Sequence, residues 1–362
     1  MAPVVAALER SERFEPIVIN SGQHRKLIEQ VIELFGIRVD RDLAVMEPNQ
    51  ALAPLMARLL ERIDAALVEL QPDMVLAQGD TSTVLATALA AFFRQIPLGH
   101  VEAGLRTGNM RSPFPEEANR VLTTPLAALH FAPTALSADN LRREQIPESR
   151  IVVTGNTVID ALFMECDRQK NAAVRDELVV RLRAQVGADY GKRPFVLITG
   201  HRRENLGGGF EQICDALATL AARFTDHLFI YPVHLNPNVQ AVVKRRLGET
   251  ENIRLIEPQS YSEFVALLAA CRLALTDSGG VQEEAPSLGK PVLVMRDTTE
   301  RPEGVTAGTA KLVGAKAESI IREVNQLLTN ESAYLAMAEA VNPYGDGQAA
   351  PRIVTAMAKY FE

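Results

Sequence analysis

Short apolar runs alternate with longer amphipathic stretches along almost the whole chain, and this alternation constrains the fold more than any other feature. The runs are continuously apolar, which is typical of parallel strands that are covered by helices on both faces. The alternation therefore predicts doubly wound βαβ domains. The predicted strands of the first part are 16–21, 74–79, 98–103, 128–133 and 151–156. Those of the second part are 195–199, 228–233, 253–258, 273–277, 291–296 and 310–314.

The strand pattern stops and then restarts beyond a charged helical stretch, so the chain divides into two domains. Its 362 residues also suit two domains of ordinary size. We predict a first domain of residues 1–160 that is completed by 346–362, and a second domain of residues 161–345. The final segment has the pattern of a helix and is expected to return to the first domain.

The composition excludes several kinds of partner. Lys and Arg number 38 and Asp and Glu 45, which gives a net charge of −7 without a long block of one sign. We therefore expect no binding to nucleic acid or to a membrane surface. No apolar run suits a membrane span and no signal peptide is recognisable, so we expect a soluble cytoplasmic protein. Cys166, Cys214 and Cys271 are too far apart for a zinc site and are expected to be buried thiols; no metal is predicted.

Acidic side chains follow predicted strands of the first domain, at the edge where open α/β sheets bind ligands. Asp80 and Glu102 come directly after strands, and Glu116 belongs to the acidic pair of the segment Ser-Pro-Phe-Pro-Glu-Glu. Arg106 and Arg120 lie near them in the sequence. Such a set suits proton transfer or the stabilisation of developing charge. Each acid also suits a helix N-terminus, and the sequence leaves both interpretations open.

The second domain contains a candidate anion site. Ser278, Gly279 and Gly280 follow a predicted strand and open a helix, where free backbone N–H groups suit a phosphate or diphosphate. A two-glycine turn by itself is also an ordinary strand-to-helix connection. Glu284, one turn into that helix, is placed to accept two ribose hydroxyls, and Arg301 is a further candidate for the anion.

A second segment supports anion binding in this domain. The sequence Thr-Gly-His-Arg-Arg-Glu-Asn follows another predicted strand and supplies His201 and Arg202. Histidine exchanges protons near neutral pH, and arginine supplies a fixed positive charge for phosphate oxygens. His234 and the segment that contains Gln23 also follow predicted strands, where loop ordering and ligand binding are equally good interpretations.

Several long motifs resemble those of one enzyme family. They are GQHR, QGDTST, HVEAGLRTGNMRSPFPEEANR, TGHRREN, YPVHLNP and TDSGGVQEEAPSLGKPVLVMRDTTERPEGVTAGT, in register along the chain. In these motifs the chain resembles the non-hydrolysing UDP-N-acetylglucosamine 2-epimerases. The resemblance implies an α/β fold of two Rossmann-like doubly wound domains facing a cleft, the GT-B arrangement. It also implies a homodimer that interconverts UDP-GlcNAc and UDP-ManNAc for surface polysaccharide synthesis, without NAD or another cofactor.

The same resemblance implies a mechanism and the residues that serve it. The family eliminates UDP to give 2-acetamidoglucal and then adds it back, with the proton returning to the opposite face of C2. The residues that match the family's catalytic side chains are Asp80, Glu102, Glu116 and His201. The implied UDP-sugar-binding residues are Arg120, Arg202, Gln259, Phe264, Ser278, Gly279, Gly280, Glu284 and Arg301. Among these, Gln259 and Phe264 are implied at the uracil and Glu284 at the ribose.

A regulatory site is also implied. Gln23, Arg58 and His234 match the site at which many bacterial members bind a second UDP-GlcNAc molecule as an activator. Lys26 stands where some members have a second glutamine, which is a departure from that site.

The chain also departs from the family at its beginning. Family members have a strand and a Gly-Thr-Arg-Pro-Glu-Ala-Ile-Lys loop ahead of the Met-Ala-Pro that opens this sequence, and that loop contributes an arginine and a lysine. We expect an impaired first domain that binds UDP better than it turns it over. The alternatives are an inactive sugar-nucleotide-binding protein, a hydrolysing epimerase that releases ManNAc and UDP, and a glycosyltransferase of the same fold.

Overall fold

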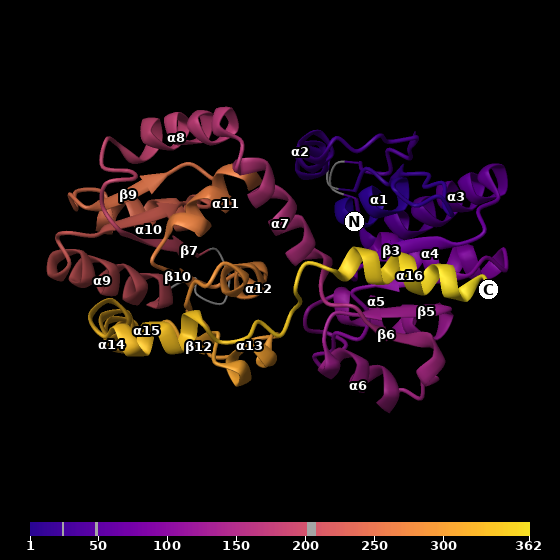
Figure 1. Ribbon diagram of the computed structural model, residues 1–362. Helices are drawn as coiled ribbons and strands as arrows, with labels where there is room; N and C mark the ends of the chain where they lie inside the picture. The colour runs from indigo at the N-terminus through magenta and orange to yellow at the C-terminus, as the bar shows by residue number, and fades with distance from the viewer. Residues whose placement is uncertain (24, 48–49, 201–207) are drawn as a thin grey trace. The chain divides into compact units, whose positions relative to one another are not determined.

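The computed structural model describes residues 1–23, 25–47, 50–200 and 208–362 (Figure 1). They form two compact units: unit 1 comprises Met1–Ala161 and Tyr344–Glu362, and unit 2 comprises Leu162–Pro343. Each unit is a Rossmann-like α/β domain with a parallel sheet, which confirms the predicted fold class. In the part of the chain that the structure describes, no helix has the length and apolar character needed to cross a bilayer.

The main sheet of unit 1 has the strand order β3-β4-β5-β6. Its strands are β3 (Val75–Gln78), β4 (Leu98–Val101), β5 (Leu129–Ala132) and β6 (Ile151–Val153), and β1 (Ile19–Asn20) and β2 (Arg41–Asp42) form a separate parallel pair. The helices are α1 (Ala2–Glu9), α2 (Arg25–Phe35), α3 (Leu52–Leu70), α4 (Ser82–Phe93), α5 (Glu116–Thr123), α6 (Ala135–Arg143) and α16 (Ala349–Tyr360), with short 3-10 turns at Thr124–Leu126 and Glu148–Arg150. Helix α7 (Thr157–Gln169) begins in unit 1 and ends in unit 2.

One sequence-based expectation for unit 1 is wrong. The pattern predicts a strand over 16–21 as one of five in the first domain, but only Ile19–Asn20 is extended, and it pairs with β2 outside the main sheet. Ile19 packs against the apolar cluster of α3 and α4, and the carboxylate of Asp40 accepts the backbone N–H of Val18 at 2.9 Å. The N–H of Val18 therefore donates to the side chain of Asp40, whereas in a longer strand it would be available to donate to the backbone of a neighbouring strand.

Unit 2 is built on a six-stranded sheet, as predicted, in the order β12-β11-β10-β7-β8-β9. The strands are β7 (Phe195–Thr199), β8 (Leu228–Pro232), β9 (Ile253–Ile256), β10 (Leu273–Thr276), β11 (Val292–Val294) and β12 (Ala310–Leu312). The helices are α8 (Ala172–Val186), α9 (Gly208–Arg223), α10 (Pro237–Leu247), α11 (Tyr261–Ala270), α12 (Gly279–Ser287), α13 (Pro302–Ala307), α14 (Ala317–Thr329) and α15 (Glu331–Ala338).

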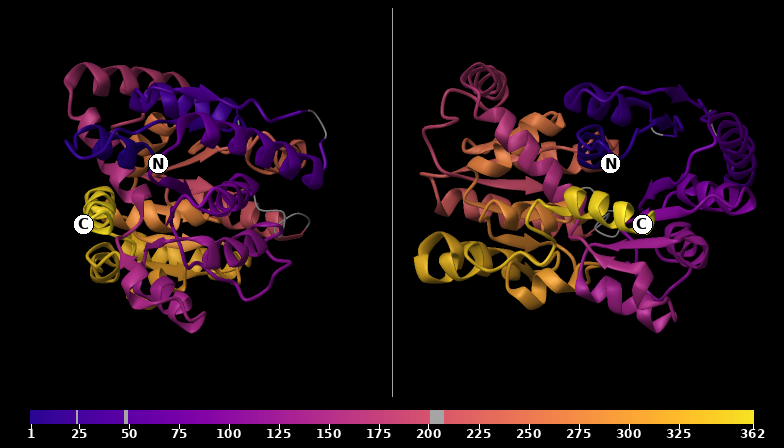
Figure 2. Two further views of the ribbon diagram at one scale, coloured as in Figure 1. Left: turned by 90° about the vertical axis from the view of Figure 1, so that its right-hand side faces the viewer. Right: turned by 45° about the vertical axis from the view of Figure 1, so that its right-hand side comes forward.

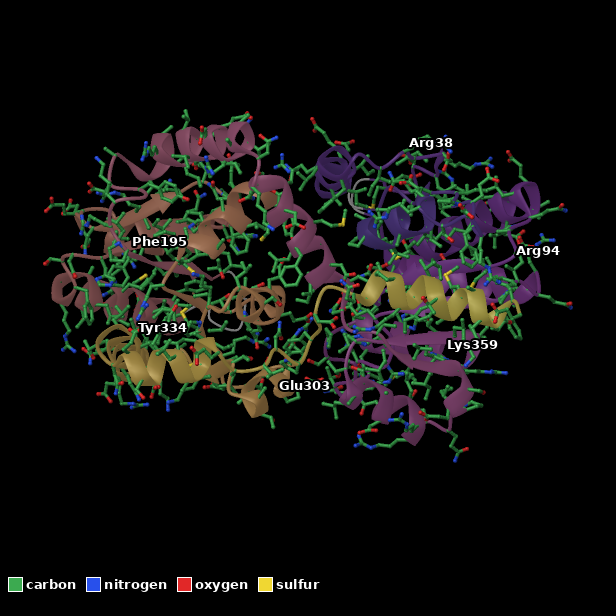
Figure 3. All side chains as sticks on the ribbon, viewed as in Figure 1. Arg38, Arg94, Phe195, Glu303, Tyr334 and Lys359 are labelled. Carbon is green, nitrogen blue, oxygen red and sulfur yellow. The ribbon has the colours of Figure 1, made fainter. Side chains whose placement is uncertain are left out.

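Apolar side chains cover both faces of this sheet. Val196 and Ile198 belong to a cluster with α9, α10 and α14, whereas Phe195 and Leu197 belong to a cluster with α8, α11 and α12. Figure 3 shows Phe195 among the packed side chains of unit 2, with Arg94 and Lys359 at the surface of unit 1. Burial on both faces explains why these strands read as continuous apolar runs.

The C-terminal helix α16 completes unit 1, beside α1 (Figure 2). Val4 and Leu8 of α1 and Ile353 of α16 pack in one cluster with side chains of β4 and β5. The buried carboxylate of Asp160 in α7 accepts the backbone N–H groups of Ala349 and Ala350 at 3.1 and 2.8 Å. Asp160 thereby satisfies donors that the first turn of a helix leaves without partners.

Candidate active site

Asp80 and Glu102 lie beside each other at the carboxyl end of the sheet in unit 1. Strands β3 and β4 are parallel, with Gln78 opposite Val101, and Gly79 donates its N–H to the carbonyl of Val101 at 3.0 Å. Glu102 has a φ of +64°, a left-handed conformation that costs energy for a residue with a side chain. A Cβ built on Gly79 would lie 3.6 Å from Oε2 of Glu102, so this side chain passes close to the turn that carries Asp80.

Helix α5 holds Asp80 from a second direction. Arg120 donates from Nε and Nη2 to Oδ2 of Asp80 at 3.0 and 2.5 Å, and Asn119 donates to its backbone carbonyl at 2.8 Å. Arg120 is buried, so its charge acts in surroundings that screen it weakly. The structure thus brings Arg120 to Asp80, whereas the sequence indicated only that Arg120 lies near the candidate acids along the chain.

The acidic pair at the start of α5 divides into two different environments. Glu116 is half-buried at the first position of the helix, one turn before Arg120. Glu117 is 1% exposed and accepts a hydrogen bond from Nη1 of Arg120 at 3.0 Å. Sequence reasoning selected Glu116 and not Glu117. The available signal was the spacing of three between Glu117 and Arg120, which places both on one helix face.

Arg106 does not join this group. It donates from Nε and Nη2 to the carboxylate of Glu144 at 2.6 and 2.8 Å and also contacts Thr124. Proximity in sequence was therefore a poor guide for Arg106, because the loop after β4 carries its side chain toward α6.

In unit 2, the start of α12 and Arg301 form the candidate anion site. Ser278 is the N-cap of α12, which begins at Gly279 directly beyond β10. A Cβ on Gly279 would lie 3.1 Å from the guanidinium of Arg301, so only glycine leaves this close approach unhindered. Arg301 also donates from Nε to Glu283 at 2.8 Å. The N-terminus of a helix, with a guanidinium packed against its first turn, suits the oxygens of a phosphate group.

Gln282 connects these two parts. Its amide donates to the carbonyl of Ser278 at 3.1 Å, and its side-chain oxygen accepts the hydroxyl of Thr299 at 2.7 Å. The hydroxyl of Thr299 in turn accepts the backbone N–H of Arg301 at 3.1 Å. This chain of hydrogen bonds fixes the loop of Arg301 against the first turn of α12.

Glu284 lies on the same helix beside α11. Tyr261 donates its hydroxyl to Oε1 of Glu284 at 2.8 Å, and burial raises the pKa of Glu284 to about 7. Phe264 is half-buried on α11, and Gln259 donates to the side chain of Gln185 at 2.7 Å just before that helix. These residues therefore share one region of unit 2.

Other predicted residues have separate environments. Gln23 accepts the hydroxyl of Thr83 at 2.7 Å, and Arg58 donates to Gln50 at 2.6 Å and pairs with Glu47. His234 is exposed and its Nδ1 accepts the backbone N–H of Asn236 at 3.1 Å. The predicted residues His201 and Arg202 lie outside the described residues.

The cysteines and titratable clusters add one correction. Cys214 and Cys271 are buried, as expected, but Cys166 is only half-buried, and all three are free thiols. Cys166 lies on α7, at a position of that helix that other side chains cover only in part. Within the described residues, no group of three or more His, Cys, Asp or Glu side chains is arranged to hold a metal ion.

Comparison with known proteins assigns the chain to a family. The family described as UDP-N-acetylglucosamine 2-epimerase matches residues 6–358. The chain belongs to this family. The UDP-N-acetylglucosamine 2-epimerase of Escherichia coli (strain K12) is 53% identical over 363 residues, which cover 99% of this chain and 94% of that protein. The enzyme of the same name from Salmonella typhimurium is 54% identical over 360 residues, covering 99% and 95%.

Solved structures of UDP-N-acetylglucosamine 2-epimerases are also similar. The Neisseria meningitidis enzyme bound to UDP-GlcNAc is 45% identical with a TM-score of 0.91, covering 99% of this chain and 96% of that one. The Methanocaldococcus jannaschii enzyme in complex with UDP-GlcNAc and UDP is 33% identical with a TM-score of 0.80, covering 99% and 95%. The expected resemblance and the expected enzyme class, a UDP-N-acetylglucosamine 2-epimerase, are thereby confirmed.

Proposed function

We propose that the protein interconverts UDP-GlcNAc and UDP-ManNAc by eliminating UDP to 2-acetamidoglucal and adding it back. The observation that carries the proposal is the group at the ends of β3 and β4, where Asp80, Glu102 and Arg120 come together. Relatives with solved structures that bind UDP-GlcNAc support the same substrate.

The chemistry explains why carboxylates and an anion site are both needed. The hydrogen on C2 lies beside a neutral acetal and is not acidic, so departure of UDP from C1 must first create positive charge. The C1–O bond breaks with its electron pair leaving on UDP, a carboxylate takes the proton from C2, and a C1–C2 double bond forms. In the return step a proton is delivered to the opposite face of C2 while a UDP oxygen bonds to C1. Carboxylates stabilise the oxocarbenium-like carbon between these states.

The residues of unit 2 are proposed to hold the leaving group. The N–H groups at Ser278, Gly279 and Gly280 and the charge of Arg301 stabilise a departing diphosphate. Glu284 accepts the ribose hydroxyls, and Gln259 and Phe264 contact the uracil. His201 and Arg202 belong to the same proposal through the family's motif, as does Glu116 in unit 1.

Incubation with UDP-GlcNAc in heavy water tests this function. Formation of UDP-ManNAc with deuterium at C2 is expected, and its absence would contradict the proposal. Release of free ManNAc and UDP would instead identify a hydrolysing epimerase. Tight UDP binding without any turnover would identify a sugar-nucleotide-binding protein.

Three further parts of the proposal rest on the family. They are a homodimer, a cytoplasmic role in the synthesis of surface polysaccharide precursors, and activation by a second UDP-GlcNAc at Gln23, Arg58 and His234. Light scattering checks the first, with an expected mass twice that of the 39.6 kDa chain. Activation predicts a sigmoidal dependence of rate on UDP-GlcNAc concentration.

A further inference from the structure

Glu117 is a buried carboxylate next to the candidate catalytic residues, and its contacts reach in two directions. Its Oε1 accepts the backbone N–H groups of Thr107 and Gly108 at 2.9 and 3.0 Å. Its Oε2 accepts Nη1 of Arg120 at 3.0 Å. With an exposed fraction of 1%, it makes these bonds out of reach of bulk water.

Arg120 is held at both ends of its guanidinium. Nε and Nη2 face Oδ2 of Asp80, while Nη1 faces Glu117. The planar fork of arginine has one orientation that satisfies two carboxylates at these positions. Without Glu117, the long side chain of Arg120 would regain rotamer freedom, and Asp80 would lose a fixed partner.

Glu117 also fixes the loop that leads into α5. Its two backbone donors, Thr107 and Gly108, belong to a loop closed by a hydrogen bond from the hydroxyl of Thr107 to the carbonyl of Ser112 at 2.7 Å. One buried carboxylate therefore joins the loop after β4 to the helix that carries Arg120 and Glu116.

We propose that Glu117 is a positioning residue for the epimerisation, which acts on Asp80 through Arg120. This inference rests on the proposed function. The side chain does not reach the sugar; it fixes the direction in which Arg120 presents its charge and hydrogen bonds to Asp80. A carboxylate displaced by a fraction of an ångström loses its alignment with the reacting atoms, so the effect falls on the chemical step.

The test compares Glu117→Gln with wild type in the heavy-water assay. Glutamine keeps the size and one acceptor for the loop but places a neutral group against Arg120. We expect kcat to fall roughly 10- to 100-fold while KM and the Kd for UDP stay within about threefold. The control is Glu148→Gln, which removes an exposed carboxylate that also pairs with an arginine, Arg142, at 2.8 and 2.7 Å, and should leave kcat unchanged.

A double-mutant cycle separates positioning from a general structural role. In an Asp80→Asn background, Glu117→Gln should lower kcat less than threefold further, because its effect passes through Asp80. An equal loss in both backgrounds, or a wild-type kcat in Glu117→Gln, overturns the inference. If Glu117→Gln does not fold, Glu117→Asp replaces it. The shorter carboxylate cannot reach both the loop and Arg120, so an unchanged kcat would overturn the inference in that variant.

The outcomes also distinguish this inference from the proposed function. Absence of C2 deuteration in the wild-type protein overturns both. Deuteration in wild type with no dependence on Glu117 overturns only the positioning role.

Discussion

The buried histidines of unit 1 allow a quantitative prediction about acid stability. His130 on β5 and His100 on β4 lie opposite each other in neighbouring strands, and both are 0% exposed. Nε2 of His100 is 2.8 Å from the carbonyl of Gly79, and both ring nitrogens of His130 are buried. Burial lowers the pKa of His130 to about 3 and that of His100 to about 4.

The direction and the size of the pH effect on stability follow from proton uptake by the two histidines. Between pH 6.5 and the lowered pKa values, the unfolded chain binds a proton at each histidine and the folded chain does not. Stability from this source is complete above pH 6.5 and is lost as the pH falls toward the folded-state pKa values. At about 1.4 kcal/mol per pH unit below 6.5, each histidine lowers the free energy of unfolding by about 2 kcal/mol between pH 7 and pH 5. The two histidines together lower it by about 4 kcal/mol.

The assay is urea unfolding of wild type and His130→Leu at several pH values, followed by far-UV circular dichroism. The leucine variant should lose only about half as much stability, or about 2 kcal/mol, over this range. It should also be at least as stable at pH 7, because leucine buries no polar atom. His234→Gln, which removes an exposed imidazole, serves as the control.

A direct measurement can refute this reasoning. The chain has six histidines, so ring resonances in a carbon-13-labelled sample are few enough to follow individually. A His130 ring that titrates near its reference pKa of about 6.5 would show that burial does not exclude the charged form. A pH dependence of stability that is equal in wild type and His130→Leu would refute it as well.

Three further predictions concern other buried groups. Because burial raises the pKa of Glu284 to about 7, from 4.5, its contribution to stability is complete below pH 4.5 and is lost as the pH rises through 7. UDP should bind more tightly over the same rise in pH, because the ionised carboxylate accepts hydroxyl donors better. Glu284→Gln should flatten the pH dependence of both the stability and the Kd for UDP. Equal pH dependences of the calorimetric Kd in wild type and Glu284→Gln would contradict this. Asp160→Ala should destabilise unit 1 by about 1–3 kcal/mol, because the N–H groups of Ala349 and Ala350 lose their acceptor; unchanged urea unfolding and unchanged proteolysis of α16 would contradict it. Gly279→Ala should weaken UDP binding about tenfold, or about 1.4 kcal/mol, by displacing Arg301, with an unaltered Kd as the opposing result.

Much of the fold was accessible from the sequence because it depends on local pattern. Runs of apolar residues predicted ten of the eleven expected strands in their observed sheets, since a strand buried on both faces must be continuously apolar. The run 16–21 failed because its pairing with Arg41–Asp42 depends on side chains distant in sequence, which the local pattern does not contain.

The residues of the candidate site were also predictable only in part. The order of strands and the rule that ligands bind at their carboxyl ends were enough to select Asp80, Glu102 and the turn at Ser278. The sequence could not show that Arg106 pairs with Glu144, or that the neighbouring acids Glu116 and Glu117 have different surroundings.

Local sequence pattern was enough to predict the α/β strands and helices, the motifs of the epimerase family and the strand ends that carry acids and glycines. The contacts between these groups come from the packed fold: the guanidinium of Arg120 lies between Asp80 and Glu117, and the start of α16 lies on Asp160. The physical reason is the sequence separation over which each kind of information acts. Periodicity reports which face of an element is buried, whereas hydrogen bonds between charged side chains depend on distances set by packing between elements far apart in the chain.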